Sequence, residues 1–183
     1  MGKNRGKKFE DVVKESFENA KNVSVDRLHD QTTGYIGSTN ICDFIVYRKP
    51  HEYYIECKSV HGNTLSISSN PKPDKNGVLH GFYGNITDKQ WEGLLEKSEI
   101  AGVFAGVICW FVDHDATVFL PIKMLQDLRD SGYKSVSILD TTWQELYGKD
   151  WNWHWLDGQK KRVFFDYDMG RLLDNIEYYY YNY

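Results

Sequence analysis

Two carboxylates and a lysine stand out in the segment CDFIVYRKPHEYYIECKSV, because their spacing allows them to meet in space. Asp43 lies near the start of one β-rich run, and Glu56 and Lys58 lie in the next run, after an interval of twelve residues. Side chains alternate between the faces of a strand, so Glu56 and Lys58 point to one face and Cys57 to the other. A hairpin between the two runs would bring Asp43 opposite them, at one edge of a sheet.

Such a set of groups suits phosphodiester hydrolysis. Oxygen ligands hold Mg²⁺, which neutralises phosphate charge and lowers the pKa of a bound water. We expect the carboxylates of Asp43 and Glu56 and the backbone carbonyl of Cys57 to be the ligands of Mg²⁺, with Mn²⁺ as a substitute. Lys58 would position or deprotonate the attacking water, or stabilise the developing charge. A surface cross-strand salt bridge between Asp43 and Lys58 would leave the same pattern, so a purely structural role stays open.

The elements that position these residues are predicted from the spacing of apolar side chains. Intervals of three and four residues indicate helices, and alternating or β-branched runs indicate strands. Helices are expected over 7–20, over 87–99 with its N-cap at Thr87 or Asp88, and from Pro121 to about Arg129. Strands are expected over 23–28, 41–47, 52–60, 102–112, 116–120 and 135–139, with 41–47 and 52–60 forming a hairpin. The run over 102–112 is apolar throughout, as in a central strand covered on both faces.

Two segments fit neither pattern. Residues 30–40 are rich in turn formers and predict a loop, and residues 69–85 hold two prolines and three glycines, which we expect to exclude regular structure. A loop of that length in a small domain is typically functional or mobile.

The order of elements indicates an α/β fold, with a central mixed β-sheet flanked by helices in a single domain over 1–183. The core is expected over about 5–140. An aromatic-rich C-terminal extension follows over about 141–183, with DWNWHWLDG and a final IEYYYYNY. Clustered aromatic residues of this kind are more typical of a core or a dimer interface than of a platform for stacking bases.

Composition limits the class of protein. The net charge of −4 argues against a protein that coats nucleic acid without specificity, although it leaves open an enzyme that acts on nucleic acid through local contacts. The three cysteines have no zinc spacing and are expected to be small buried thiols, and the chain begins without an apolar signal segment. A cytoplasmic protein is expected.

The motifs, taken in order over residues 5–125, resemble the PD-(D/E)xK nucleases, and most of all the RecU-type Holliday-junction resolvases. A basic, Gly-containing start leads into a helix with a glutamate, Glu10, and small residues precede the first aspartate. A Glu-x-Lys strand is followed by a polar stretch with a threonine, and a glutamine, Gln90, lies on the next helix. The matching stretches are RGKKFE (5–10), GSTNICD (37–43), ECKS (56–59), NTLSI (63–67), TDKQW (87–91), GVFAGVICWF (102–111) and FLP (119–121).

By this resemblance the fold would have a restriction-endonuclease-like core, Asp43 and Glu56 would hold the metal, and Lys58 would be the catalytic lysine. Gln90 would be a further catalytic residue, and Glu10 an additional acidic group near the metal. Plainer roles for the last two stay open, as an exposed helix glutamine and as a first-turn acid facing the helix dipole. Basic residues expected to contact DNA are Lys3, Arg5, Lys7, Lys8, Lys72, Lys75 and Lys89.

The resemblance implies a DNA endonuclease that resolves branched junctions in DNA recombination and repair, acting as a homodimer because two symmetric cuts need two-fold symmetry. RecU-type proteins insert a long basic stalk before the first aspartate, and residues 24–40 are too few for one. A compact, stalk-less version of the kind a phage or mobile element encodes is therefore implied. The alternatives are a sequence-specific restriction or homing endonuclease, and a non-catalytic DNA-binding module.

Overall fold

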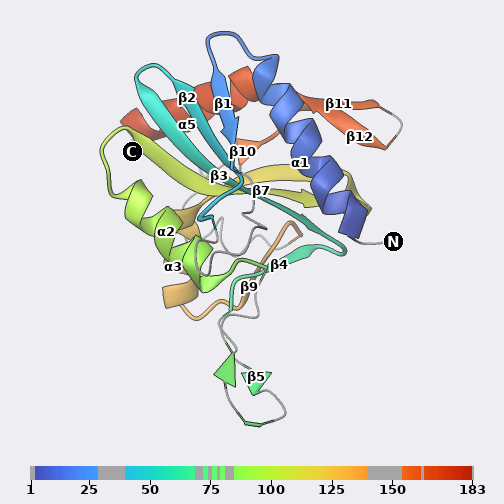
Figure 1. Cartoon of the computed structure of the whole chain (residues 1–183), viewed down its shortest axis with the longest axis vertical. Coiled ribbons are helices and arrows are strands. Elements are labelled where there is room, and N and C mark those ends of the chain that lie inside the picture. Colours follow the sequence, from blue (N-terminus) through green and yellow to red (C-terminus); the bar gives the residue numbers. More distant parts are fainter. Residues whose placement is uncertain are drawn as a thin grey trace, which may run out of the picture.

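A six-stranded mixed sheet lies at the centre of the computed structural model (Figure 1). The structure describes residues 3–28, 40–68, 72–73, 76–77, 79–80, 85–139, 154–161 and 163–182. Its strands, in spatial order, are β1 (Ser24–Arg27), β2 (Phe44–Arg48), β3 (His51–Val60), β7 (Val103–Phe111), β8 (Ala116–Pro121) and β10 (His154–Trp155). β3 and β7 run parallel, and the other neighbours run antiparallel. The predicted α/β fold with a mixed sheet is confirmed.

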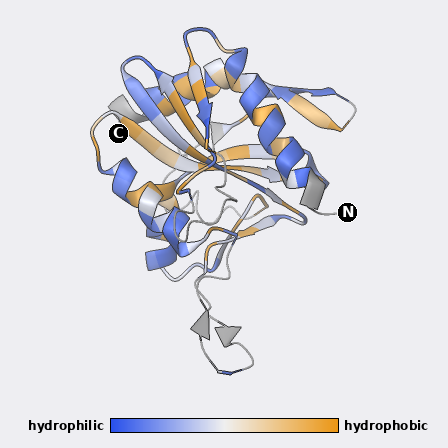
Figure 2. Cartoon of the chain, in the orientation of Figure 1, coloured by the Kyte–Doolittle hydropathy of each residue, from blue (hydrophilic) through white to orange (hydrophobic). Residues whose placement is uncertain are grey.

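Helices cover both faces of this sheet (Figure 1). α1 (Lys3–Glu18) and α5 (Met169–Asn182) pack on one face, and their buried residues include Phe9, Phe17 and Leu173. α2 (Asp88–Ser98) and α3 (Ile122–Asp130) pack on the other, where Trp91 and Leu125 are buried. Figure 2 shows hydrophobic residues gathered on the sheet and on the helix sides turned toward it. The sheet therefore separates two apolar cores.

The predicted hairpin is confirmed and fixes the register of the candidate residues. β2 and β3 pair antiparallel with Phe44 opposite Ile55. Asp43, one residue before β2, donates its backbone N–H to the carbonyl of Ile55 and so lies beside this part of β3. Cys57 lies in the core under α1, and Tyr54 in the core under α2 and α3. Because side chains alternate along a strand, Glu56 and Lys58 face the α2 side. Glu56 and Lys58 thus face one side of the sheet and Cys57 the other, as predicted.

The helix and strand predictions hold for the described part of the chain, with three corrections. The strand expected over 41–47 begins only at Phe44, so Asp43 lies just before it. The first helix begins at Lys3 rather than at residue 7, because the early turn carries no apolar side chain that would reveal it. In the segment 69–85, expected to exclude regular structure, β5 (Lys72–Pro73) pairs antiparallel with β6 (Leu79–His80). Two residues are enough for a strand pair, and Gly77, with a φ of 78°, lies in the turn between them. Apart from Asn76 and Asn85, the rest of that segment lies outside the described residues, as does the predicted loop over 30–39.

The segment that composition sets apart as an aromatic extension contributes to the core under α1. β10 pairs with β8 at the edge of the sheet, β11 (Gly158–Lys161) and β12 (Phe164–Tyr167) form a hairpin, and α5 follows. Buried residues of this segment are Leu156, Tyr167, Met169, Leu172, Leu173 and Ile176. Trp151 and Trp153 lie outside the described residues.

Two small features complete the description. β4 (Thr64–Ser66) pairs antiparallel with β9 (Ser135–Ser137), which joins the segment after β3 to the segment after α3. The cysteines Cys42, Cys57 and Cys109 are free and buried, as predicted. Among the helices that the structure describes, none is long and apolar enough to cross a membrane.

Candidate active site

Asp43 is held at the entrance to β2 by its neighbours on both sides. Its backbone N–H donates to the carbonyl of Ile55 (3.0 Å), and its carbonyl accepts from the N–H of Leu28 (2.8 Å). Its carboxylate Oδ2 accepts from the backbone N–H of Cys57 at 2.7 Å. These bonds attach Asp43 to the end of β1 and to the middle of β3, so its carboxylate has a fixed place beside Glu56.

Glu56 is a buried carboxylate with one oxygen engaged and one without a partner. Its side chain is only 3% exposed. Its Oε1 accepts from Lys58 Nζ and from Gln90 Nε2, both at 2.6 Å. Its Oε2 is also buried, and it has no hydrogen-bond partner among the described residues. An unpartnered buried carboxylate oxygen is costly, and it therefore requires a ligand or a proton.

Gln90 joins α2 to this pair. It lies in the first turn of α2, and besides donating to Glu56 its Oε1 faces Lys58 Nζ at 3.4 Å. The reading of Gln90 as an exposed helix residue is therefore wrong. Asp43, Glu56, Lys58 and Gln90, which the sequence assigns to one site, lie together at one edge of β2 and β3, with α2 above them.

The carboxylates act on one another electrostatically. Burial raises the pKa of Glu56 to about 8; the positive charge of Lys58 opposes this, while the negative charges of Asp43 and Glu10 add to it. Burial, followed by the charge of Asp43, raises the pKa of Glu10. The carboxylates thus repel one another when ionised, and a bound cation would relieve that repulsion.

Glu10 lies near this group but has a partner of its own. Its carboxylate pairs with the guanidinium of Arg27, which also pairs with Asp11. Arg27 lies over the ring of Phe44 at 5.9 Å and is itself mostly buried. α1 begins at Lys3, so Glu10 is not in the first turn, and the reading of Glu10 as a first-turn acid facing the dipole is wrong.

The donor set fits a divalent ion of the Mg²⁺ type. No three His, Cys, Asp or Glu side chains are placed to hold an ion together in the part of the chain that the structure describes. Mg²⁺ commonly keeps several of its waters and takes only one or two protein carboxylates, so such a set is not required. The unpartnered Oε2 of Glu56, beside Asp43, is an oxygen donor of the required kind.

The arrangement of helices and strands has a likeness among solved structures. The fold is similar to that of a Holliday junction resolvase. That protein is Hjc from Archaeoglobus fulgidus, an archaeal hyperthermophile, at 17% sequence identity and a TM-score of 0.48, covering 73% of this chain and 89% of that chain. No family model and no curated protein matches the sequence.

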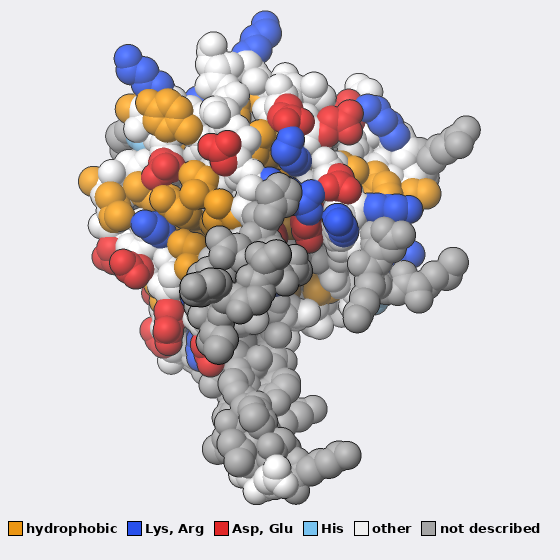
Figure 3. Space-filling model, viewed as in Figure 1, with side chains coloured by type: hydrophobic (Ala, Val, Ile, Leu, Met, Phe, Trp, Pro, Cys, Tyr) orange, Lys and Arg blue, Asp and Glu red, His pale blue; other side chains and the backbone are white. Residues whose placement is uncertain are grey.

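The basic residues expected to contact DNA are only partly described. Lys7 and Lys8 are exposed on α1, and Lys89 is exposed on α2 beside Gln90. Arg5 donates to Nε2 of His61 at 3.0 Å, just beyond the end of β3. Lys and Arg side chains, interspersed with acidic ones, gather along α1 on the face in Figure 3. The side chains of Lys3 and Lys72, and all of Lys75, lie outside the described residues.

Three residues contribute to the site in ways that the sequence analysis does not predict. Arg27 carries no recognisable motif, and only the fold brings it to Glu10. Thr87 was predicted only as an alternative N-cap, although Thr87-x-x-Gln90 has the spacing of a capping box, a signal legible in the sequence. Gly93 also positions the site, because a Cβ there would lie 2.4 Å from Ile41 Cγ2. The glycine lets α2 lie close to the residues that precede Asp43.

Proposed function

We propose that this protein is a metal-dependent DNA endonuclease that hydrolyses phosphodiester bonds at the Asp43–Glu56–Lys58 site. The observation that carries the proposal is the state of Glu56, which is buried, bonded through Oε1 to Lys58 and Gln90, and unpartnered at Oε2 among the described residues. A simple surface salt bridge would need no burial. Burying a carboxylate costs desolvation free energy, and this cost is expected at a site that binds a cation and excludes bulk water.

In this proposal Asp43, Glu56 and the carbonyl of Cys57 hold Mg²⁺. A bound ion of this kind supplies charge neutralisation at the phosphate and lowers the pKa of a coordinated water. Asp43 is suited to the role because the N–H of Cys57 fixes its Oδ2 at 2.7 Å. Glu10, attached to Arg27, is assigned the part of an additional negative charge beside the ligands.

Lys58 is assigned to the reacting water and phosphate. Its side chain is 21% exposed, so its Nζ lies at the boundary between the buried carboxylate and solvent. From there it can orient the water, and it can stabilise the negative charge that develops on phosphate oxygens. The amide of Gln90 holds the side chains of Lys58 and Glu56 in place through hydrogen bonds to both.

For the substrate we propose branched DNA, and for the assembly a homodimer, in the manner of the RecU-type resolvases that the motifs resemble. A chain with a net charge of −4 can form few phosphate contacts. Discrimination would then depend on where the basic residues of α1 and of the 69–85 segment meet the diverging arms of a junction. A linear duplex would satisfy only half of a two-fold surface.

The test compares a four-way junction with a linear duplex of the same sequence, in Mg²⁺, in EDTA and in Ca²⁺. Cleavage in Mg²⁺ and its absence in EDTA are expected. In Ca²⁺, which permits binding without cleavage, the junction should bind more tightly by roughly 2 kcal/mol, about thirtyfold, below the ~4–10 kcal/mol of fully specific complexes. Equal binding with cutting at one duplex sequence would favour a restriction or homing enzyme. DNA binding without cleavage in any divalent ion would leave a non-catalytic module.

A further inference from the structure

The side chain of Gln90 belongs to two hydrogen-bond networks at once. In α2 it is the third residue of a capping box: Thr87 Oγ1 accepts from the N–H of Gln90 at 3.3 Å, and Gln90 Oε1 accepts from the N–H of Thr87 at 3.1 Å. At the site its Nε2 donates to Glu56 Oε1 at 2.6 Å. The cap of the helix and the candidate active site therefore share one amide group.

The partners of this amide permit one of its two orientations. The N–H of Thr87 and the Nζ of Lys58 are donors, so both must face the oxygen of the Gln90 amide. The carboxylate of Glu56 only accepts when ionised, so it must face the nitrogen. Rotating the amide by half a turn would set donor against donor at Thr87 and acceptor against acceptor at Glu56. The backbone N–H of Thr87, together with Lys58 and Glu56, thus selects the orientation that directs Nε2 to Glu56. The Thr87 hydroxyl holds the backbone of Gln90 where its amide can reach these partners.

We propose that Thr87 is a positioning residue of the active site, acting through Gln90; the inference rests on the proposed nuclease function. Its hydroxyl fixes the backbone of Gln90, and its N–H fixes the amide. Gln90 and Lys58 together then occupy Oε1 of Glu56, and Oε2 remains as the oxygen available to the ion. Partners that orient a metal ligand typically change metal affinity or activity by about 10–100-fold when removed.

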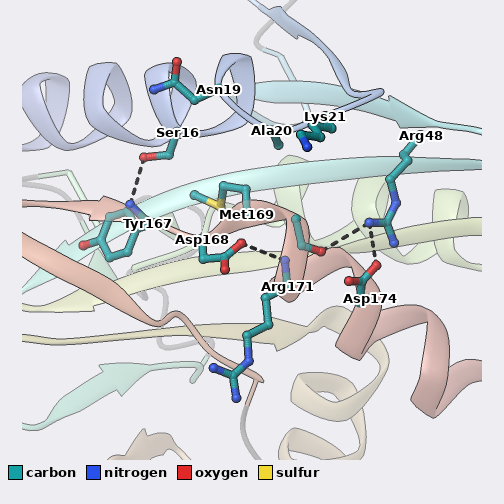
Figure 4. Close-up of a pocket in the computed structure, with 11 residues that line it drawn as sticks. Ser16, Asn19, Ala20, Lys21, Arg48, Tyr167, Asp168, Met169, Arg171 and Asp174 are labelled. Atoms are coloured by element: carbon teal, nitrogen blue, oxygen red, sulfur yellow. Dashed lines mark hydrogen bonds and ion pairs between the residues drawn. The ribbon is translucent and has the colours of Figure 1, made fainter.

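The chain offers a matched control for the loss of a helix cap. Asp168 precedes α5, and its Oδ1 accepts from the N–H of Arg171 at 3.0 Å, the bond that an N-cap makes. Asp168 lines a cavity of about 460 Å³, together with residues from in and around α1, β2, β12 and α5 (Figure 4). None of the candidate site residues lines this cavity. Asp168→Ala therefore removes a cap without touching Gln90.

The experiment compares wild type, Thr87→Ala, Thr87→Ser and Asp168→Ala. The first readout needs neither metal nor activity: it is the solvent exchange of the Gln90 side-chain amide protons, followed by ¹⁵N NMR. Their protection should be the same in wild type, Thr87→Ser and Asp168→Ala. It should be clearly lower in Thr87→Ala, which keeps the N–H of Thr87 but loses the hydroxyl that holds the backbone of Gln90. The second readout is single-turnover cleavage in Mg²⁺. It should fall about tenfold in Thr87→Ala and stay within about twofold of wild type in Thr87→Ser and Asp168→Ala.

The outcomes are distinct. Retained protection of the Gln90 amide in Thr87→Ala overturns the inference. So does an equal loss of cleavage in Thr87→Ala and Asp168→Ala at equal thermal stability, because Thr87 would then be a cap and nothing more. If wild type does not cleave DNA, the proposed function fails, while the NMR comparison still decides whether Thr87 orients Gln90.

Discussion

The carboxylate of Asp43 accepts a hydrogen bond of 2.7 Å from the backbone N–H of Cys57, across the β2–β3 hairpin. Cys57 lies between Glu56 and Lys58 on β3, and its backbone thus holds the carboxylate of Asp43 next to them. This bond is also available to asparagine, whose side-chain carbonyl can accept it. The charge of Asp43 can therefore be removed while the hairpin contact is kept.

Asp43→Asn and Glu56→Gln should each lower DNA cleavage by roughly 10³-fold or more. Removing a metal-holding carboxylate forfeits several kcal/mol of charge stabilisation, at tenfold per ~1.4 kcal/mol. Affinity for DNA should stay within a few-fold, because most of it comes from basic residues elsewhere. Cleavage assays beside gel-shift titrations in Ca²⁺ check this. Near wild-type cleavage by either variant would refute the site.

Lys58→Ala should be as inactive as the carboxylate variants and still bind the ion. Lys58 touches Glu56 and Gln90 through its Nζ and has no oxygen to offer a metal. Its loss should cost stabilisation of the developing charge rather than affinity for the ion. Calorimetric titration with Mn²⁺ measures that affinity directly. A Lys58→Ala protein that no longer binds Mn²⁺ would contradict the assigned role.

Divalent ions should raise the melting temperature of the wild-type protein and not that of Glu56→Gln. Burial and the neighbouring carboxylates raise the pKa of Glu56, and an ion that binds only the native state favours the ionised carboxylate there. At one hundred times its Kd, a ligand that binds only the native state adds about 2.7 kcal/mol. Thermal scans in EDTA and in increasing Mn²⁺ would measure the shift. Equal shifts in both proteins would place the ion elsewhere.

Gly93→Ala should destabilise the protein by roughly 1–2 kcal/mol. Alanine favours a helix by about 1 kcal/mol, but its Cβ would lie 2.4 and 2.7 Å from Cγ2 and Cβ of Ile41, and overpacking costs ~1–3 kcal/mol. Displacing α2 also moves Gln90, so cleavage should fall as well. Gly170→Ala is the control, since the nearest atom there is 3.5 Å away. Chemical unfolding should find Gly170→Ala neutral or more stable.

Tyr53 should make stability fall in alkaline solution. Burial, followed by the neighbouring Glu177, raises the pKa of its phenol above the ordinary value of 10.0. Above pH 10 the unfolded chain releases this proton while the folded protein keeps it, so the free energy of unfolding declines. Tyr53→Phe, which loses the hydrogen bond to Glu177, should be less stable at pH 7 by roughly 1.5 kcal/mol and decline less steeply above pH 10. Unfolding curves from pH 7 to 11 that stay parallel for the two proteins would exclude this contribution.

The sequence predicts much of the hairpin and its candidate site because both follow from local rules. Alternation along one strand separates Glu56 and Lys58 from Cys57, and the antiparallel hairpin brings Asp43 to this part of β3. Long-range contacts are harder to predict. The pairing of Arg27 with Glu10 and the contact of Gly93 with Ile41 depend on how α1 and α2 approach the sheet, and neither leaves a periodic signal.

The C-terminal segment also has features that the sequence does not predict. Its aromatic composition does not reveal which residues face inward, because aromatic side chains are frequent both in cores and at partly exposed positions. Tyr167 and Leu173 are buried, whereas Tyr178 is exposed. Only the packing of β12 and α5 against the rest of this core distinguishes them.

α1 and α5 pack on the same face of the sheet, so part of the cover of α1 comes from a much later segment of the chain. Ser16 of α1 accepts from the N–H of Tyr167, and Arg48 of β2 pairs with Asp174 and Glu177 of α5. α1 leaves the ribosome before α5, and part of its apolar side stays uncovered until α5 follows, about 150 residues later. At about 5–20 residues per second, that interval lasts roughly 8–30 seconds. During it, Phe9, Val13 and Phe17 present an apolar surface of the kind that chaperones bind.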